Sequence, residues 1–101
     1  MKPLHISEEA FPRVLAAKET VLIDFYADWC GPCRMLAPTI EEIAAEREDI
    51  LVGKINVDDA PALAEKYGVM SIPTVLVIKN GDEVARLVGV RPKADILKAI
   101  G

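Results

Sequence analysis

Residues Val21–Arg34, VLIDFYADWCGPCR, place an apolar segment directly before a turn that carries two cysteines. The segment 21–27 is apolar on both faces except at Asp24, which is typical of a central β-strand covered on two sides. The turn contains Gly31 and Pro32, and proline suits the first turn of an α-helix. We therefore expect a strand–turn–helix unit in which the cysteines lie at the start of the helix.

Segments on either side of this unit alternate between strand and helix patterns. We expect further strands at residues 3–6, 51–57, 74–79 and 83–88, and helices at 8–17, from the cysteine turn to about 47, at 60–67 and at 92–100. Asn80-Gly81 favours a tight hairpin between the last two strands. This order predicts an α/β fold with a mixed central β-sheet of about five strands and about four helices on its two faces. We assign residues 1–101 to a single domain.

Two details of the helices follow from residue type. Ser7 is a candidate N-cap of the first helix, because a serine side chain can accept a hydrogen bond from a free backbone N–H. The last helix should turn one apolar face toward the sheet. That face comprises Ala94, Ile96, Leu97 and Ile100.

Composition and charge narrow the classes of function. The 101 residues carry a formal net charge of -4, and 51% of them are hydrophobic, which suits a folded domain. A mildly acidic surface disfavours nucleic acid and anionic membranes as partners. No segment approaches the roughly 20 apolar residues that span a bilayer, and the first residues lack the apolar stretch of a signal peptide. We expect a cytoplasmic protein, unless a leader has been removed.

The only two cysteines, Cys30 and Cys33, are badly placed for a structural staple. Closing a loop of about four residues contributes roughly 2 kcal/mol, against about 4.7 kcal/mol for a loop of 100 residues. A structural zinc site is disfavoured, because zinc takes four ligands and His5 is the only histidine. A metal site shared across a dimer and a chance proximity of two thiols remain alternatives. The strand–turn–helix context favours redox chemistry over both.

We expect the two cysteines to differ in exposure and in role. Thiolate is the reactive form of cysteine, and a helix N-terminus favours it through free N–H groups and the helix dipole. Cys30, at that end, should present its sulfur outward, whereas Cys33, one turn into the helix, should be more buried. Cys30 would then attack a disulfide of a partner protein, and Cys33 would resolve the mixed disulfide by attacking Cys30.

Asp24 is the second informative residue, because a lone carboxylate in a buried strand is unfavourable when ionised. Burial should raise its pKa. It is either an acid/base that takes the proton from Cys33 or a hydrogen-bonded structural aspartate, and spacing does not separate these hypotheses. Lys54, in the middle of the next central strand, either pairs with Asp24 or extends its ammonium to solvent.

Three positions near the turn stay open on physical grounds. Pro73 precedes a strand, and the low frequency of cis X–Pro bonds, about 5–6%, favours a trans bond to Ile72. Trp29 is either part of the core or a partly exposed lid on the site. Arg34 is either a charge that favours thiolate or a solvated residue of the helix.

The chain resembles the thioredoxin family over essentially its whole length. A single Cys-x-x-Cys pair is a weak signal, but here it is one of an ordered set of motifs. The set is DFYADWCGPC at 24–33, AP at 37–38, KINVD at 54–58, YGV at 67–69, IPT at 72–74, KNG at 79–81 and VG at 88–89.

The resemblance implies a protein-disulfide reductase and electron carrier with the family's fold. It implies that Cys30 attacks, that Cys33 resolves, and that Asp24 is the buried acid/base with Lys54 nearby. No metal and no cofactor beyond the Cys30–Cys33 disulfide are implied.

The resemblance also implies how partners bind. It places a cis bond between Ile72 and Pro73, facing the cysteine pair. The surface that docks extended protein substrates would comprise Trp29, Gly31, Pro32, Ile72, Pro73 and Gly89. The chain would act as a monomer, regenerated by an NADPH-dependent thioredoxin reductase or, in some organisms, a ferredoxin-dependent one. Gly-Pro between the cysteines resembles the reducing branch of the family.

Some residues depart from the family pattern without touching the cysteine chemistry. Tyr26 replaces a tryptophan found in many bacterial members, and Arg34 replaces a frequent lysine. Met70-Ser71 precedes Ile72 where other pairs are common, which bears on the choice of partners. A non-catalytic module that binds proteins through the same docking surface is the alternative function.

Overall fold

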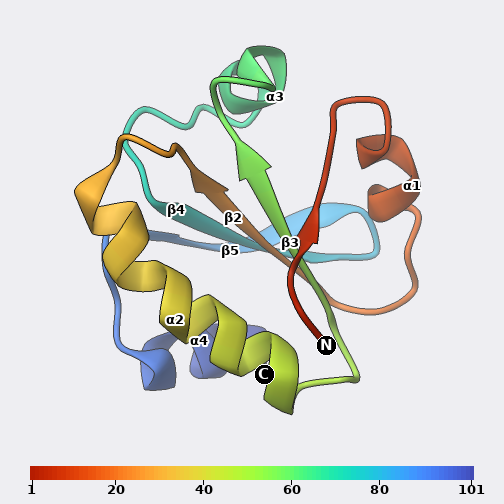
Figure 1. Ribbon diagram of the computed structural model, residues 1–101. Helices are drawn as coiled ribbons and strands as arrows, with labels where there is room; N and C mark the ends of the chain where they lie inside the picture. The colour runs from red at the N-terminus through yellow and green to blue at the C-terminus, as the bar shows by residue number, and fades with distance from the viewer.

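Five strands form one mixed sheet in the order β1-β3-β2-β4-β5 (Figure 1). The computed structural model describes residues 1–101. Its strands are β1 (Leu4–His5), β2 (Val21–Tyr26), β3 (Leu51–Asn56), β4 (Thr74–Lys79) and β5 (Asp82–Val88). Its helices are α1 (Phe11–Leu15), α2 (Gly31–Glu46), α3 (Pro61–Lys66) and α4 (Lys93–Ile100). The predicted α/β order and mixed sheet are confirmed.

Strand β2 is the centre of the sheet. It pairs in parallel with β3 and antiparallel with β4, and β1 extends the parallel side. Its first five residues are buried, as the two-sided apolar pattern predicts. Since β2 leads directly into α2, the cysteine turn is anchored to the central strand of the sheet.

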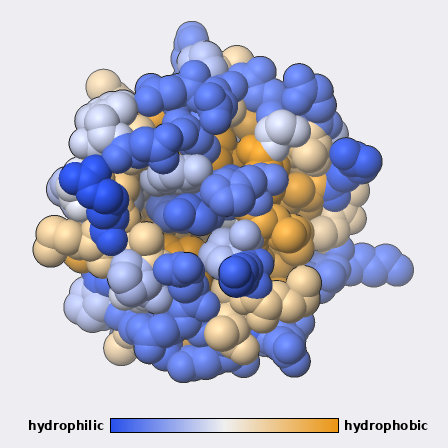
Figure 2. All heavy atoms as spheres, in the orientation of Figure 1, coloured by the Kyte–Doolittle hydropathy of each residue, from blue (hydrophilic) through white to orange (hydrophobic).

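Two apolar cores lie on the two faces of the sheet. Helices α2 and α4 cover one face, where Leu36, Ile40 and Ile96 pack against strand residues such as Leu22. Helices α1 and α3 cover the other face (Figure 1). In Figure 2, hydrophilic atoms cover most of the visible face. Hydrophobic atoms show mainly right of centre, near α1 and the strand β1, which has only two residues. No helix has the length and apolar character needed to cross a membrane.

The hairpin between β4 and β5 has the predicted turn. Asn80 and Gly81 have φ angles of 53° and 81°, and such left-handed conformations suit glycine and asparagine in two-residue hairpin loops. The hairpin makes the β4–β5 edge antiparallel. It thereby fixes Thr74, the first residue of β4, opposite Val88.

Two helix details differ from the expectations. Helix α1 begins at Phe11, so Ser7 is not its N-cap, although the Ser7 hydroxyl accepts a hydrogen bond from the Ala10 N–H at 3.2 Å. Pro12 lies in the first turn, where its missing N–H is harmless. In α4, Ile96 and Ile100 are buried one turn apart, which leaves Ala94 on the exposed side.

Gly53 on β3 provides a first test of how Ile6, the residue after β1, packs against the sheet. A Cβ at this position would fall on the side chain of Ile6, which is buried. Gly53→Ala should therefore lower the free energy of unfolding by about 1–3 kcal/mol, the range for overpacking a core. Urea unfolding measures the loss.

The matched background for this test is Ile6→Val, which removes the Cδ1 methyl that lies nearest to the added Cβ. In that background, Gly53→Ala should lower stability by clearly less. Equal losses in the two backgrounds would show that contact with Ile6 is not the reason for a glycine at this position.

Candidate active site

The cysteine turn lies where β2 ends and α2 begins. Cys30 is the N-cap of α2, with extended backbone angles of φ -88° and ψ 111°. The backbone N–H of Cys33 donates to the Cys30 sulfur at 3.2 Å. The two residues form a disulfide with a Cα–Cα distance of 5.3 Å. A helix N-terminus therefore points its free N–H groups and positive dipole end at Cys30.

The expected difference in exposure between the cysteines is wrong for this disulfide-bonded state. Cys30 is 4% exposed and Cys33 is 3% exposed. Both pack with Ala27 in a small cluster, against Tyr26 and Ile72 among others. The loop before β4 covers Cys30, which the position of a residue within its own helix does not reveal.

The loop before β4 carries a cis bond between Ile72 and Pro73. The general frequency of X–Pro bonds gave the wrong prediction here, and the family resemblance gave the right one. The Ile72 carbonyl oxygen lies 3.8 Å from the Cys30 sulfur. The Gly89 N–H donates to the Pro73 carbonyl at 2.8 Å, so the end of β5 is tied to the same loop.

Trp29 is a lid and not a core residue. It is 69% exposed, and its indole N–H donates to the Asp58 carboxylate at 2.9 Å. The backbone N–H of Asp58 in turn donates to the Asn56 side chain at 2.9 Å. Sequence reasoning gave Asp58 no role, because 29 residues separate it from Trp29. Its place just after a strand that neighbours β2 is the one signal that could have found it.

A largely apolar groove of about 590 Å³ opens beside the lid. Trp29 and Ile72 form part of its wall, and Met70 on its rim is 97% exposed. The groove continues onto α3 through Pro61 and Ala64. Sequence reasoning noted Met70 but did not find the contribution of α3, because nothing in the spacing shows which helix faces this loop.

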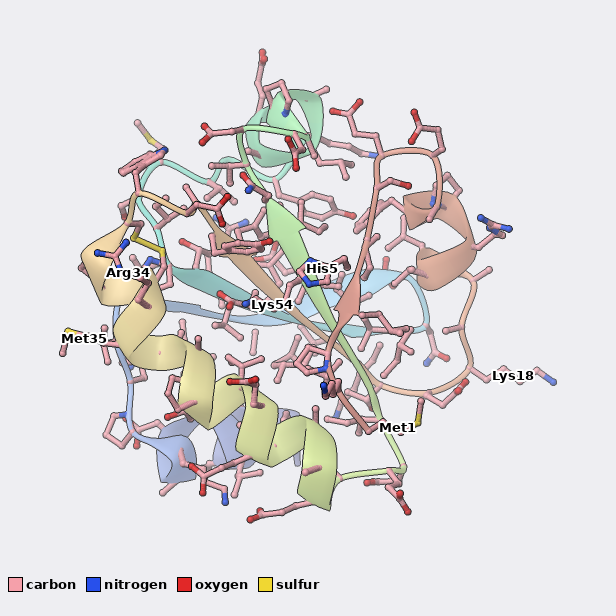
Figure 3. All side chains as sticks on the ribbon, viewed as in Figure 1. Met1, His5, Lys18, Arg34, Met35 and Lys54 are labelled. Carbon is pink, nitrogen blue, oxygen red and sulfur yellow. A yellow bond between two sulfur atoms is a disulfide. The ribbon has the colours of Figure 1, made fainter.

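Arg34 points back to the turn. Its guanidinium donates to the carbonyl oxygen of Asp28 at 2.7 Å. In Figure 3, Arg34 on α2 and Lys54 on β3 lie on the same side of the sheet as the yellow disulfide bond. Both residues line a cavity of about 140 Å³ together with Cys33. Arg34 thus tethers the turn that precedes Cys30.

Asp24 is buried beneath the α2 face of the sheet. Asp24 is 1% exposed, and neither of its carboxylate oxygens has a hydrogen-bond partner within the protein. Burial raises its pKa to about 6, and the nearby charge of Lys54 opposes that rise. It lies two residues after Leu22 on β2 and so shares the sheet face of Leu22, which packs in the α2–α4 core. The structure contains no hydrogen bond that would make Asp24 a structural aspartate.

Lys54 lies directly beside Asp24 in the parallel register of β2 and β3. Its ammonium does not form an ion pair with Asp24. The ion pairs of the protein join only Arg47, Arg86 and Lys93 to carboxylates. The ammonium lies instead over the Tyr26 ring, 4.4 Å from its centroid. Lys54 is therefore a charge near Asp24 without direct contact.

The fold thus gathers the predicted site residues at one end of the sheet. Cys30 joins Trp29 and Ile72 on the outer side of the turn, and Pro73 links this group to Gly89. Cys33 shares a cavity with Lys54 on the inner side. The side chains include no group of three or more histidine, cysteine, aspartate or glutamate residues that could hold a metal ion.

Comparison with known proteins agrees with this geometry. The family model described as Thioredoxin matches residues 2–101. A thioredoxin of Chlamydia caviae is 50% identical over 95 residues, which cover 94% of this chain and 92% of that protein. A thioredoxin of Streptomyces clavuligerus is 45% identical over 95 residues, with 93% and 89% covered.

Solved structures show the same likeness. A mutant thioredoxin from Halobacterium salinarum superposes with a TM-score of 0.91 at 39% identity, covering 98% of this chain and 88% of that one. A Malassezia sympodialis thioredoxin gives a TM-score of 0.90 at 32% identity, with the same coverage. Fold, disulfide and sequence agree over the whole length, and the chain belongs to the thioredoxin family of thiol–disulfide oxidoreductases, as a protein-disulfide reductase.

Proposed function

We propose that this oxidoreductase reduces protein disulfides with Cys30 as the attacking cysteine and Cys33 as the resolving one. The observation that carries the proposal is the position of Cys30 as N-cap of α2, where its sulfur accepts the Cys33 N–H. Hydrogen bonds to a charged acceptor are strong, and the helix dipole adds to them, so the thiolate form of Cys30 is favoured.

In the first step, the Cys30 thiolate attacks one sulfur of the partner's disulfide. A Cys30–partner disulfide forms, the partner's own S–S bond breaks, and the other partner sulfur leaves as a thiolate. We expect the partner's backbone to lie beside the carbonyl oxygen of Ile72 during the attack, because that oxygen is 3.8 Å from the Cys30 sulfur.

In the second step, Cys33 loses its proton to the Asp24 carboxylate and attacks the Cys30 sulfur. The Cys30–Cys33 disulfide forms, and the partner's second sulfur leaves as a thiolate, so that two electrons have passed to the partner. With a pKa of about 6, Asp24 is roughly 90% ionised at pH 7 and is a stronger base than an exposed aspartate.

Docking uses the surface around the lid. Trp29 and Met70 are exposed and border the apolar groove, and Ile72 forms its inner wall. Burial of such side chains against a partner supplies affinity without sequence-specific contacts. The full docking surface that we propose comprises Trp29, Gly31, Pro32, Ile72, Pro73 and Gly89.

The same proposal covers the partners and the setting. We infer that residues 1–101 act as one monomeric domain in the cytoplasm, where a reducing milieu suits a reductant. The partners are protein disulfides and a thioredoxin reductase that returns two electrons from NADPH or ferredoxin.

Insulin reduction tests the activity. With dithiothreitol as electron source, the chain should make insulin precipitate markedly earlier than dithiothreitol alone, because the Cys30 thiolate attacks faster than a small thiol. The turbidity trace measures the effect. A trace that matches dithiothreitol alone would favour the non-catalytic binding module, in which the cysteine pair does not turn over.

A further inference from the structure

The Lys54 ammonium lies over an aromatic ring. Lys54 is the register neighbour of the buried Asp24, yet its Nζ lies over the ring of Tyr26 at 4.4 Å from the centroid. This distance is within the range of a cation–π interaction. Both Asp24 oxygens meanwhile have no hydrogen-bond partner within the protein. One cation therefore has two competing positions, and the structure shows it at the ring.

Tyr26 is itself held in place from the other side. Its hydroxyl lies 3.4 Å from Nδ1 of His5, and the two rings meet edge to face with centroids 6.5 Å apart. His5 is the register neighbour of Lys54 on β1, and Figure 3 shows the two labelled side chains next to each other. Tyr26 and Lys54 line both a 240 Å³ cavity on the His5 side and the 140 Å³ cavity that reaches Cys33.

We propose that Tyr26 is a positioning residue that holds the Lys54 ammonium on its ring face and out of ion-pair contact with the Asp24 carboxylate. The edge-to-face contact with the His5 ring fixes the Tyr26 ring. The arrangement leaves Asp24 close to a positive charge but without a direct partner. An acid/base in this state can accept a proton at neutral pH more readily than one that is locked in an ion pair.

Other charged groups surround this trio and must be held constant in any test. They are His5 from β1, Glu8 and Glu9 before α1, Asp28 from the active turn, Arg34 from α2 and Asp59 after β3, while Cys33 is held in the disulfide. Strand β4 adds no charge, because Val75 lies opposite Asp24 there. Every substitution in the test is therefore confined to Tyr26 and Lys54.

The test measures the pKa of Asp24 by ¹³C-carboxyl NMR titration of the oxidised protein. Tyr26→Leu removes the ring, so Lys54 should move to Asp24 and lower its pKa from about 6 by roughly one unit or more, as an adjacent opposite charge does. Tyr26→Phe is the matched control. It keeps the ring face and loses only the hydroxyl, and the pKa of Asp24 should stay unchanged.

A second background separates the charge from solvent exposure, since loss of the ring also uncovers Asp24. Lys54→Met alone should raise the pKa of Asp24, because the opposing charge is removed. Adding Tyr26→Leu to Lys54→Met should then lower that pKa clearly less than Tyr26→Leu lowers it when Lys54 is present. An equal fall in both backgrounds would mean that Tyr26 only shields Asp24 from water, and the proposal would be wrong.

The inference gains its catalytic meaning from the proposed acid/base role of Asp24, but its test does not depend on that role. A pKa shift is observed whether or not Asp24 takes the proton of Cys33, whereas the rate of the second step in Asp24→Asn tests the role itself. If Tyr26→Leu does not fold, Tyr26→Met provides the same loss of the ring. No change of the Asp24 pKa in either ring-less variant would also overturn the proposal.

Discussion

Replacing Cys33 with serine should turn the protein into a trap for its substrates. Cys30 still attacks a partner disulfide, because its place at the N-terminus of α2 is unchanged. The resolving thiol is gone, so the mixed disulfide persists instead of being released. Non-reducing gels of C33S mixed with oxidised insulin should show a covalent adduct that dithiothreitol removes, and multiple turnover should fall to the dithiothreitol background.

Replacing Cys30 with serine should abolish both turnover and trapping. Turnover should fall at least about a thousandfold, as when a catalytic nucleophile is removed. The double variant C30S/C33S is the control for non-specific adducts. Accumulation of the adduct in C30S and not in C33S would exchange the roles of the two cysteines. Comparing C30S with C33S is a fair test of the two roles, because both cysteines are about equally buried in the disulfide state and burial alone does not favour either as the attacking residue.

Much of the fold follows from local patterns. The two-sided apolar run of Val21–Tyr26 predicts the central strand, and Asn80-Gly81 predicts the hairpin, because burial and turn geometry act within a few residues. The start of helix α1 was predicted less well from the sequence. Ser7 has the chemistry of a cap, but the helix begins at Phe11, where packing on the sheet sets the boundary.

The site shows the same division between local and long-range causes. The place of Cys30 at a helix start and the burial of Asp24 follow from neighbouring residues. The loop at Ile72 that covers Cys30, and the hydrogen bond from Trp29 to Asp58, each join segments that are far apart in the chain. The cis bond at Pro73 could be predicted only through the family resemblance, because local physics favours the trans form.

Asp24→Asn should make the folded protein more stable at neutral pH. The carboxyl has a pKa of about 6 in the folded state and 3.8 as its ordinary value. A difference of that size corresponds to about 3 kcal/mol at pH 7, where the wild type must keep a carboxylate buried. The gain for the variant should be nearly complete above pH 7, should shrink as the pH falls through 6, and should vanish only below 3.8, where the wild-type carboxyl is protonated in both states.

Urea unfolding of the oxidised proteins at several pH values measures this gain. Glu41→Gln changes an exposed carboxyl on α2 and is the matched control, with an expected change within about 0.5 kcal/mol. Between pH 4 and pH 6, wild-type stability should fall as the pH rises, and the slope from this residue should be absent in Asp24→Asn. A gain that is the same at pH 4 and pH 7.5 would assign the effect to packing and not to charge.

The same variant should be slower in the second step of the reaction. Under the proposed mechanism the carboxylate accepts the proton of Cys33, so the attack of Cys33 on the mixed disulfide should slow by roughly 10²–10⁴-fold in Asp24→Asn, the usual contribution of a general base. The substitution Asp24→Asn would then raise the stability of the fold and lower the rate of the second step. Such opposition is expected if Asp24 takes the proton of Cys33, as we propose, because a buried unpartnered carboxylate by itself weakens the fold. A variant that is more stable and equally fast would remove Asp24 from the mechanism.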